Sequence, residues 1–198
     1  MDKRDLEQLL SNVADGSVAP ADALTRIQTA PTADLGFAQL DLSRGVRQGA
    51  GEVIYGAGKT AEQIAAIIEA LLDAGQERIL VTRLDADKAA RTAELLADNI
   101  DLGYVPDAQL ALVGGMPSPT GNGRIVVACA GTSDLPVAEE AALTAEFYGN
   151  EVDRLYDVGV AGLHRLLAHA EELAQAQVVI AIAGMEGALA SVIGGLVS

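Results

Sequence analysis

The chain has 198 residues, 50% of them hydrophobic and only 3% aromatic, so its core is expected to consist of alanine, valine, leucine and isoleucine. Its net charge of −15 disfavours binding to nucleic acids and anionic membranes, and an anionic small ligand would need a local basic or amide-lined pocket. The single cysteine, Cys129, excludes an internal disulfide and a zinc–thiolate cluster.

The N-terminal segment MDKRDLEQLL mixes charges and lacks the apolar core of a signal peptide. No apolar run in the sequence approaches the ~20 residues that span a bilayer. We therefore expect a soluble, cytoplasmic protein.

Residues 1–117 are predicted to form a small α/β domain with a helical start over residues 1–30. Residues 31–34 read as a turn, and Thr60 with Gln63 forms a capping box that starts a helix. Hydrophobic spacing predicts helices over residues 2–14, 20–27, 61–74 and 86–98, and strands over 37–42, 52–55, 78–82 and 109–113.

The Gly/Pro/Ser-rich segment 114–124 reads as a domain boundary, so residues 118–198 are predicted to form a second domain. Three βα units follow one another in it. The predicted strands are 125–130, 151–157 and 177–183, and the predicted helices are 135–148, 160–175 and 187–197. This alternation predicts an α/β domain with a parallel, doubly wound sheet.

The run VVIAIAGMEGAL, residues 178–189, predicts a strand buried on both faces that leads into a glycine turn carrying Glu186. Ligands of open parallel sheets bind at the carboxyl ends of the strands, where this carboxylate is expected to lie. Alternatively, Glu186 is simply an acid in the first turn of a helix, where the helix dipole favours negative charge.

The turn Gly131–Asp134 follows the first strand of this domain and precedes a helix. Its hydroxyls and amides are suited to an anion, while Ser133 or Asp134 is equally suited to capping the helix. The sequence leaves both interpretations open.

Other short motifs are weaker. The segment GAGKT, residues 56–60, is not a P-loop because position 53, where the first glycine is required, is valine, although Lys59 and the helix start could hold a phosphate. His164 and His169 are five residues apart and face different sides of a helix, which disfavours a shared metal. Cys129 reads as a core thiol.

Five blocks of the sequence resemble the LarB family, the nickel-pincer nucleotide cofactor biosynthesis proteins of lactate racemase maturation. They are EVIYGAGKTAEQIAAI, VTRLDADKAA, GTSDLPVAEEAALTAEFYGN, YDVGVAGLHRLLAH and VVIAIAGMEGALASVIGGLV. The resemblance begins near Asp34. It implies that the second domain is similar to PurE-type aminoimidazole ribonucleotide carboxylases, a three-layer αβα fold.

The resemblance also implies a reaction: carboxylation of the pyridinium ring of nicotinic acid adenine dinucleotide by carbon dioxide, then hydrolysis of its phosphoanhydride. The products are AMP and pyridinium-3,5-biscarboxylic acid mononucleotide, in the first step of nickel-pincer nucleotide synthesis. In such chemistry a thiolate adds to the electron-poor ring, the ring attacks carbon dioxide, and a carboxylate base removes the ring proton before the thiolate leaves.

By motif, the resemblance implies that Glu186 is the base and that Asp134 belongs to the catalytic and phosphate-binding loop. The implied substrate- and phosphate-binding residues are Ala130, Gly131, Thr132, Ser133, Asp157, His164, Arg165, Gly184, Met185 and Gly187. The sequence does not rank the basic candidates for binding the dinucleotide, which are Lys59, Arg83, Arg154 and Arg165.

Two features depart from the family pattern. The nucleophilic cysteine of the family lies downstream of the GGLV helix, beyond Ser198, and Ala190 replaces a usual proline. We therefore expect the PurE-like domain to be C-terminally incomplete. Two alternatives follow: a non-catalytic nucleotide-binding or assembly subunit, and a PurE-type carboxylase or mutase, which is disfavoured because the PurE-type histidine is missing.

The expected partner is a small-molecule dinucleotide. The sequence requires no cofactor and predicts no metal site, although it leaves a magnesium ion open. The short sheet, the alanine-rich last helix and the resemblance together predict a homo-oligomer, an octamer by resemblance, with active sites at its interfaces.

Overall fold

The computed structural model of the chain describes residues 3–28, 32–42, 44–45 and 49–197. It is an α/β protein, as predicted, and divides into two compact units. The first unit contains Met1–Gly103 and Ala111–Gly114, and the second contains Tyr104–Leu110 and Gly115–Ser198. No helix within the described residues has the length and apolar character needed to cross a bilayer.

The first unit begins with two helices, α1 (Lys3–Ala14) and α2 (Pro20–Gln28), which pack together and bury Leu9 and Ala23. Both helices confirm the prediction, except that Asp2 lies outside the described residues. The turn predicted for residues 31–34 is wrong over its described part, because β1 (Thr32–Asp34) pairs antiparallel with β2 (Gln39–Asp41). Gly36, with a φ of +78°, provides the left-handed residue that this tight hairpin requires.

A four-stranded sheet has the strand order β3-β4-β6-β5, and most of its residues belong to the first unit. Strand β3 (Val53–Tyr55) is parallel to β4 (Ile79–Thr82), which is antiparallel to β6 (Leu110–Val113). Strand β5 (Leu102–Val105) was not predicted. It is short and includes Gly103, so only its pairing with β6 makes it a strand.

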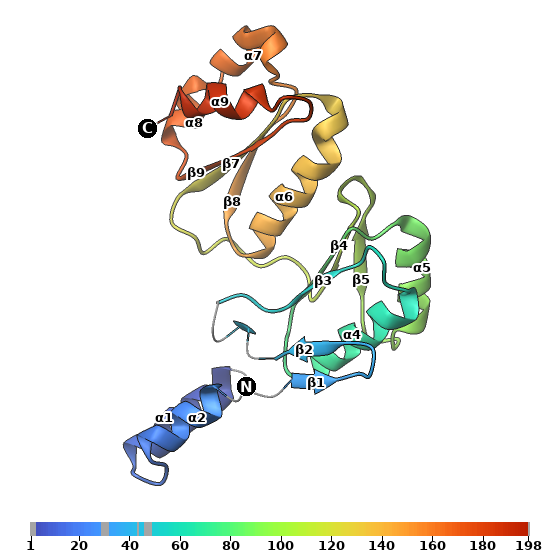
Figure 1. The fold of residues 1–198 in the computed structure, drawn as a ribbon, viewed down its shortest axis with the longest axis vertical. Coiled ribbons are helices and arrows are strands. Elements are labelled where there is room, and N and C mark those ends of the chain that lie inside the picture. Colours follow the sequence, from blue (N-terminus) through green and yellow to red (C-terminus); the bar gives the residue numbers. More distant parts are fainter. Residues whose placement is uncertain (1–2, 29–31, 43, 46–48, 198) are drawn as a thin grey trace. The chain divides into compact units, whose positions relative to one another are not determined.

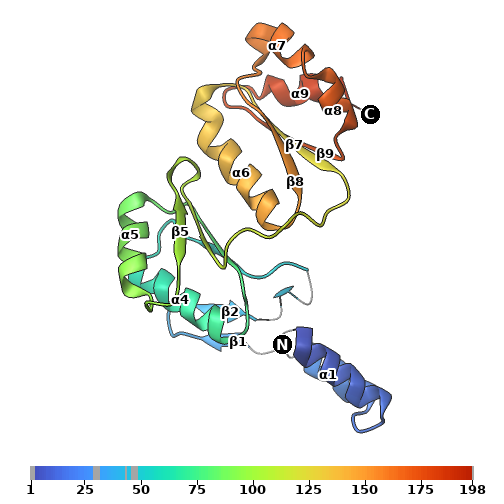
Figure 2. The same ribbon diagram turned by 180° about the vertical axis from the view of Figure 1, so that it is seen from behind.

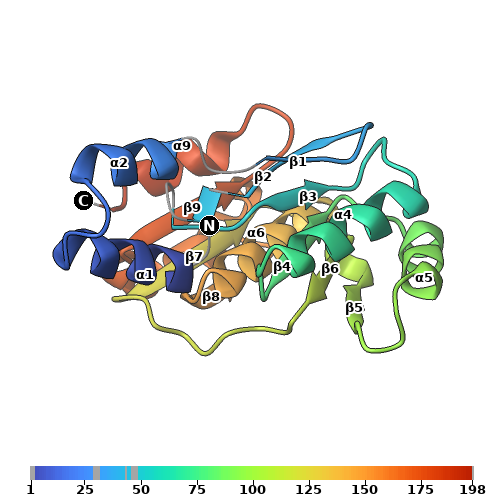
Figure 3. The same cartoon turned by 90° about the horizontal axis from the view of Figure 1, so that it is seen from below.

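Helices α4 (Ala61–Asp73) and α5 (Ala86–Leu95) pack against each other in the first unit (Figure 3). The capping box of Thr60 and Gln63 is present, which confirms the predicted start of α4, and Asp85 caps α5. Helix α5 ends at Leu95, three residues before the predicted end. The fully buried side chains include Ile64, Ile68, Leu71, Ile79, Leu80 and Val81.

The second unit is a parallel sheet of β7 (Arg124–Cys129), β8 (Glu151–Leu155) and β9 (Val178–Ile182), in the order β8-β7-β9. The chain places its second strand on one side of the first and its third strand on the other side. A doubly wound sheet has this reversal, and the predicted αβα architecture is confirmed (Figures 1 and 2).

Helix α6 (Leu135–Phe147) covers one face of this sheet, where Ala138 and Ala142 contact Val127 and Cys129. The other face is covered by α7 (Leu163–Leu167), α8 (Ala170–Gln175) and α9 (Ala188–Gly194). Their buried side chains Leu166, Leu173, Leu189 and Ile193 meet Val126 and Ala128 of β7.

Two predictions for this unit are wrong in detail. The helix predicted over residues 160–175 is split, because His169 at the N-cap position contacts the Glu172 carboxylate at 3.0 Å and a new helix, α8, begins there. Strand β9 is not buried on both faces: it lies at the edge of the sheet, and Val178 is 50% exposed. The buried central strand is β7.

Candidate active site

Three turns meet the requirements for a site at the carboxyl edge of the second unit's sheet, because β7, β8 and β9 are parallel and their turns leave the same edge. The β7 turn is residues 130–134, the β8 turn residues 156–159, and the β9 turn residues 183–187. Each carries one acid, Asp134, Asp157 or Glu186. The reversal of strand order lies between β7 and β9, where open sheets of this type bind their ligands.

The β7 turn is held by the carboxylate of Asp134. Its Oδ2 accepts a hydrogen bond from the backbone N–H of Gly131 at 3.0 Å, and the 3₁₀ turn Thr132–Asp134 lies between them. Asp134 occupies the N-cap position of α6, yet its side chain makes no capping hydrogen bond to that helix. Asp134 therefore does not cap α6 but closes the capping box of the preceding 3₁₀ turn. Thr132 and Ser133 are exposed beside it.

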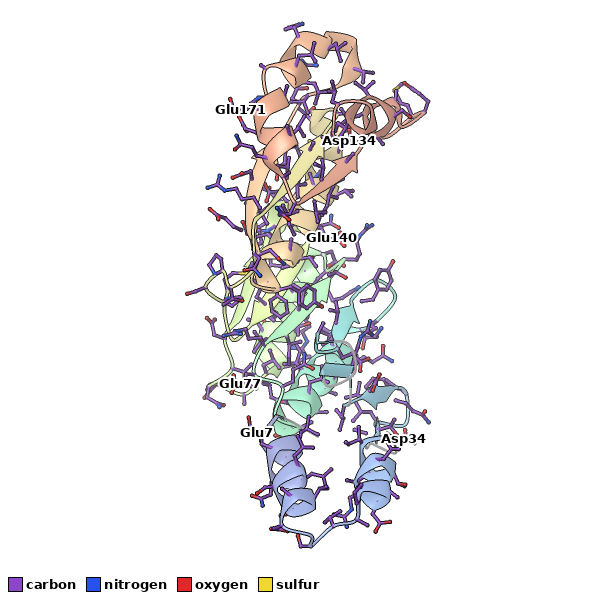
Figure 4. All side chains as sticks on the ribbon, turned by 90° about the vertical axis from the view of Figure 1, so that its left-hand side faces the viewer. Glu7, Asp34, Glu77, Asp134, Glu140 and Glu171 are labelled. Atoms are coloured by element: carbon purple, nitrogen blue, oxygen red, sulfur yellow. The ribbon has the colours of Figure 1, made fainter. Side chains whose placement is uncertain are left out.

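Asp134 also links the β7 turn to the β9 turn. A Cβ atom added to Gly184 would lie 3.6 Å from Oδ1 of Asp134, so these two residues lie next to each other. Figure 4 labels Asp134 among the side chains of the second unit. The structure thus brings Gly131, Asp134 and Gly184, from two separate sequence motifs, into one place.

The β9 turn has an unusual backbone. Met185 has a φ of +53° and Gly187 a φ of +68°, and the N–H of Gly187 donates to the carbonyl of Gly184 at 3.0 Å. A non-glycine residue in the left-handed region costs free energy, and such residues gather at functional sites. Met185 is fully exposed and Glu186 is also exposed, so both side chains of this turn face solvent.

The β8 turn contributes an ion pair. Arg165 of α7 donates to the carboxylate of Asp157, which itself has a φ of +56°. The turn closes onto β7, since the N–H of Val158 donates to the carbonyl of Cys129 at 3.0 Å. A Cβ at Gly159 would lie only 2.6 Å from the carbonyl oxygen of Ala130, so this position needs glycine for the close approach.

Cys129 lies at the end of β7, beneath this edge. Its side chain is buried, as predicted for a core thiol, and it contacts the alanine face of α6. Burial raises the pKa of the thiol above its ordinary value, and the negative charges of Asp134 and Asp157 raise it further. A neutral, buried thiol is not a nucleophile.

A polar network that was not predicted from the sequence lies between α6 and β8. The hydroxyl of Tyr156 donates to Glu139 at 2.8 Å, and Arg154 pairs with Glu139 and, through two bonds, with Glu146. Burial and then the bond to Glu139 raise the pKa of Tyr156. Tyr156 directly precedes Asp157, so the network fixes the start of the β8 turn.

Most of the predicted binding residues lie at the carboxyl edge of the sheet. They are Ala130, Gly131, Thr132, Ser133, Asp157, Arg165, Gly184, Met185 and Gly187. His164 is exposed on α7, next to Arg165. Of the unranked basic candidates, Arg165 lies at this edge, Arg154 is engaged by the two glutamates of α6, and Lys59 and Arg83 belong to the first unit. Among the described residues, no group of three or more His, Cys, Asp or Glu side chains is arranged to hold a metal ion.

Comparison of the sequence with known proteins identifies a related protein family. Residues 32–114 match the model of the LarB/PurE-like N-terminal domain. Over 163 residues the chain is 34% identical to the uncharacterized protein MJ0165 of Methanocaldococcus jannaschii, which covers 80% of this chain and 64% of that protein. The chain therefore spans less than two thirds of the length of this relative. The match over residues 32–114 supports the LarB family recognised in the sequence blocks.

Proposed function

We propose, on the premise that this chain carries a LarB/PurE-like N-terminal domain, that the protein carboxylates the pyridinium ring of nicotinic acid adenine dinucleotide and hydrolyses its phosphoanhydride. The family match supports a carboxylase of the LarB or PurE type. The specific reaction on nicotinic acid adenine dinucleotide is our proposal. Its products are pyridinium-3,5-biscarboxylic acid mononucleotide and AMP.

The observation that carries this proposal is the contact between two distant motifs. Gly184 of the GMEG motif lies against the carboxylate of Asp134 of the GTSD motif, so the turn that carries Glu186 and the GTSD turn lie side by side. Both turns lie at the strand-order reversal of the sheet, where ligands of doubly wound domains bind.

Glu186 is the proposed general base. After a thiolate has added to the ring, a ring carbon attacks carbon dioxide and a new C–C bond forms. Glu186 then takes the proton from that carbon, and the thiolate leaves as the ring regains its aromaticity. A base in an exposed turn releases this proton to water before the next turnover.

The other residues of the edge bind and orient the substrate. The exposed hydroxyls of Thr132 and Ser133 offer donors to a phosphate, and the Arg165 guanidinium, held by Asp157, offers its remaining donors. In the hydrolytic step, water adds to the phosphorus and the P–O–P bridge breaks, giving AMP and the mononucleotide. Asp134 is the proposed acceptor of the proton from that water.

The thiolate is not supplied by Cys129, whose side chain is buried and whose pKa is raised by that burial. In the family that the sequence resembles, the nucleophilic cysteine lies downstream of the GGLV helix.

The experiment measures AMP release from nicotinic acid adenine dinucleotide by chromatography, in buffer equilibrated with carbon dioxide and in buffer freed of it. We expect AMP only where carbon dioxide is present, because carboxylation precedes hydrolysis in the proposed order. No AMP in either buffer would sink the proposal, and equal release in both would show a simple pyrophosphatase.

A second candidate is a nucleotide-binding or assembly subunit without turnover, which the burial of the chain's single cysteine favours. It predicts that AMP binds in a calorimeter while the dinucleotide stays intact. AMP binding with no product from the dinucleotide would select this candidate over the carboxylase.

A further inference from the structure

A second edge of parallel strands lies in the first unit, at the carboxyl ends of β3 and β4. The turns after the two strands touch: the N–H of Gly56 donates to the carbonyl of Thr82 at 2.7 Å. A Cβ at Gly56 would lie 3.0 Å from that oxygen and 3.2 Å from the carbonyl oxygen of Arg83. Residues 56–60 and 83–88 therefore lie next to each other at this edge of the sheet.

Two of the chain's three lysines converge there. The ammonium of Lys59 donates to the carbonyl of Tyr55 at 3.0 Å, and that of Lys88 donates to the carbonyl of Gly56 at 3.2 Å. The two groups thus sit on the carbonyls of consecutive residues, although they come from a turn and from helix α5. An ammonium has three donors, so each lysine keeps donors for a ligand.

Three cations gather at this edge in a strongly acidic chain. Arg83, exposed and with a φ of +54°, adds a third cation to the two lysines. The nearby acids are Asp85, whose Oδ2 lies 3.5 Å from the Lys88 ammonium, Asp87, and Glu62, which bonds Thr60 and pairs with Arg91 at 3.8 Å. Three cations thus lie in two short segments of a chain whose net charge is −15, which favours an anion there.

An aromatic ring completes the arrangement. Tyr55, the last residue of β3 and the neighbour of Thr82 in the sheet, is 57% exposed. The backbone carbonyl of Tyr55 accepts the Lys59 ammonium, so an exposed aromatic residue and a cation belong to the same turn. An aromatic ring that stacks on a base and cations that hold a phosphate are the combination that binds a nucleotide. The helix start itself adds little, since the capping box already occupies the N–H groups of Thr60 and Gln63.

We propose that the carboxyl end of the β3–β4 pair binds a mononucleotide, with Lys59, Lys88 and Arg83 on its phosphate and Tyr55 on its base. The site stands on the first unit alone and does not depend on the proposed carboxylation, although AMP is a product of that reaction. A binding measurement without turnover therefore fails or succeeds separately from the reaction.

The experiment titrates the full chain with AMP, inorganic phosphate and adenosine by calorimetry. AMP should bind more tightly than either fragment, because it engages both the cations and the ring. Lys59→Gln should weaken AMP binding by about tenfold, the typical effect of losing one charge-assisted hydrogen bond, whereas Lys59→Arg should retain it. Tyr55→Ala should bring the affinity for AMP down to that for phosphate.

Arg78→Gln is the matched control, because Arg78 is exposed at the amino end of β4, the opposite end of the same strand. It should leave AMP binding unchanged. Circular dichroism establishes that each variant is folded. If Lys59→Gln does not fold, Lys59→Arg and Tyr55→Ala still test the site. Wild-type affinity in both Lys59→Gln and Tyr55→Ala, or AMP binding that is lost only in Arg165→Gln of the second unit, would overturn the proposal.

Discussion

At the scale of single residues, Asp134 and Glu186 carry the account of the second unit. Their sequence motifs indicated an acid at the end of each strand, but the sequence left open whether Asp134 merely caps a helix. In the structure its carboxylate bonds the Gly131 N–H, as a capping box of the 3₁₀ turn, and its other oxygen lies next to Gly184, while it makes no bond to α6. The contact joins residues 50 positions apart, and no local pattern encodes such a contact.

Glu186→Gln tests the proposed base. The amide has the size of the carboxylate but does not accept the ring proton, so carboxylation should slow by about 10²–10⁴-fold, the usual contribution of a general base. Dinucleotide affinity should stay within about twofold of wild type, because an exposed side chain changes in charge alone. Initial rates and calorimetry measure the two effects.

Glu171→Gln is the control for that substitution, since Glu171 is an exposed glutamate on α8, away from the strand ends (Figure 4). Its turnover should equal that of the wild type. Equal turnover in Glu186→Gln as well would remove the base assignment.

Cys129 gives a prediction about alkaline pH. Burial raises the pKa of its thiol in the folded protein, so folding favours the neutral form. The resulting stability is complete below the pKa of the unfolded chain, about 8.5, and is lost as pH rises through the higher pKa of the folded state. The free energy of unfolding, from urea titrations between neutral and alkaline pH, should therefore fall more steeply in wild type than in Cys129→Ala. Parallel pH profiles would contradict the buried, neutral thiol.

At the scale of elements, amphipathic helices and apolar strands could be predicted because their signals are local. The capping box of Thr60 and the capping of α5 by Asp85 are examples. The short strands β1 and β5 could not be predicted, since three or four residues acquire strand conformation only by pairing with β2 and β6. The edge position of β9 was also not predicted, because an apolar run does not reveal how many neighbours a strand has.

A substitution of Gly114, directly after β6, tests how closely the backbone packs in the first unit. It has a φ of +78°, and an added Cβ would lie 2.2 Å from the carbonyl oxygen of Glu77. Gly114→Ala should lower the free energy of unfolding by more than about 3 kcal/mol, because left-handed strain of about 1–2 kcal/mol adds to a backbone collision. Urea unfolding followed by circular dichroism measures it.

Gly115 provides the comparison, with a φ of +71° and no atom within 4 Å of the added Cβ. Gly115→Ala should cost only the left-handed strain, about 1–2 kcal/mol. Equal effects of the two substitutions would show that the contact at Gly114 relaxes.

At the scale of the whole molecule, the alternation of strands and helices predicted the doubly wound sheet, while the strand order β8-β7-β9 emerged only from the structure. A groove of about 480 Å³ runs beside β9 and the helices α8 and α9. It is lined by Leu173, Ala174, Ala176, Gln177, Val179, Ala181, Ala190, Ile193, Gly194 and Val197. An edge strand with unpaired backbone groups favours association.

The homo-oligomer therefore stays a prediction with a direct test. Sedimentation equilibrium of the purified protein should give a mass several times that of one chain, and eight times if the octamer implied by the LarB resemblance forms. Val178→Lys, which places a charge on the exposed edge of β9, should reduce that mass. A monomer over the whole concentration range would contradict the prediction.

We propose that the GTSD and GMEG turns together attach carbon dioxide to a pyridinium ring. Incubation of the protein with nicotinic acid adenine dinucleotide and ¹³C-labelled bicarbonate, followed by mass spectrometry of the mononucleotide, tests this reaction. We expect a mononucleotide that carries one added, labelled carboxylate, formed in equal amount with AMP. A mononucleotide without the added carboxylate, or no mononucleotide at all, would contradict the proposed reaction.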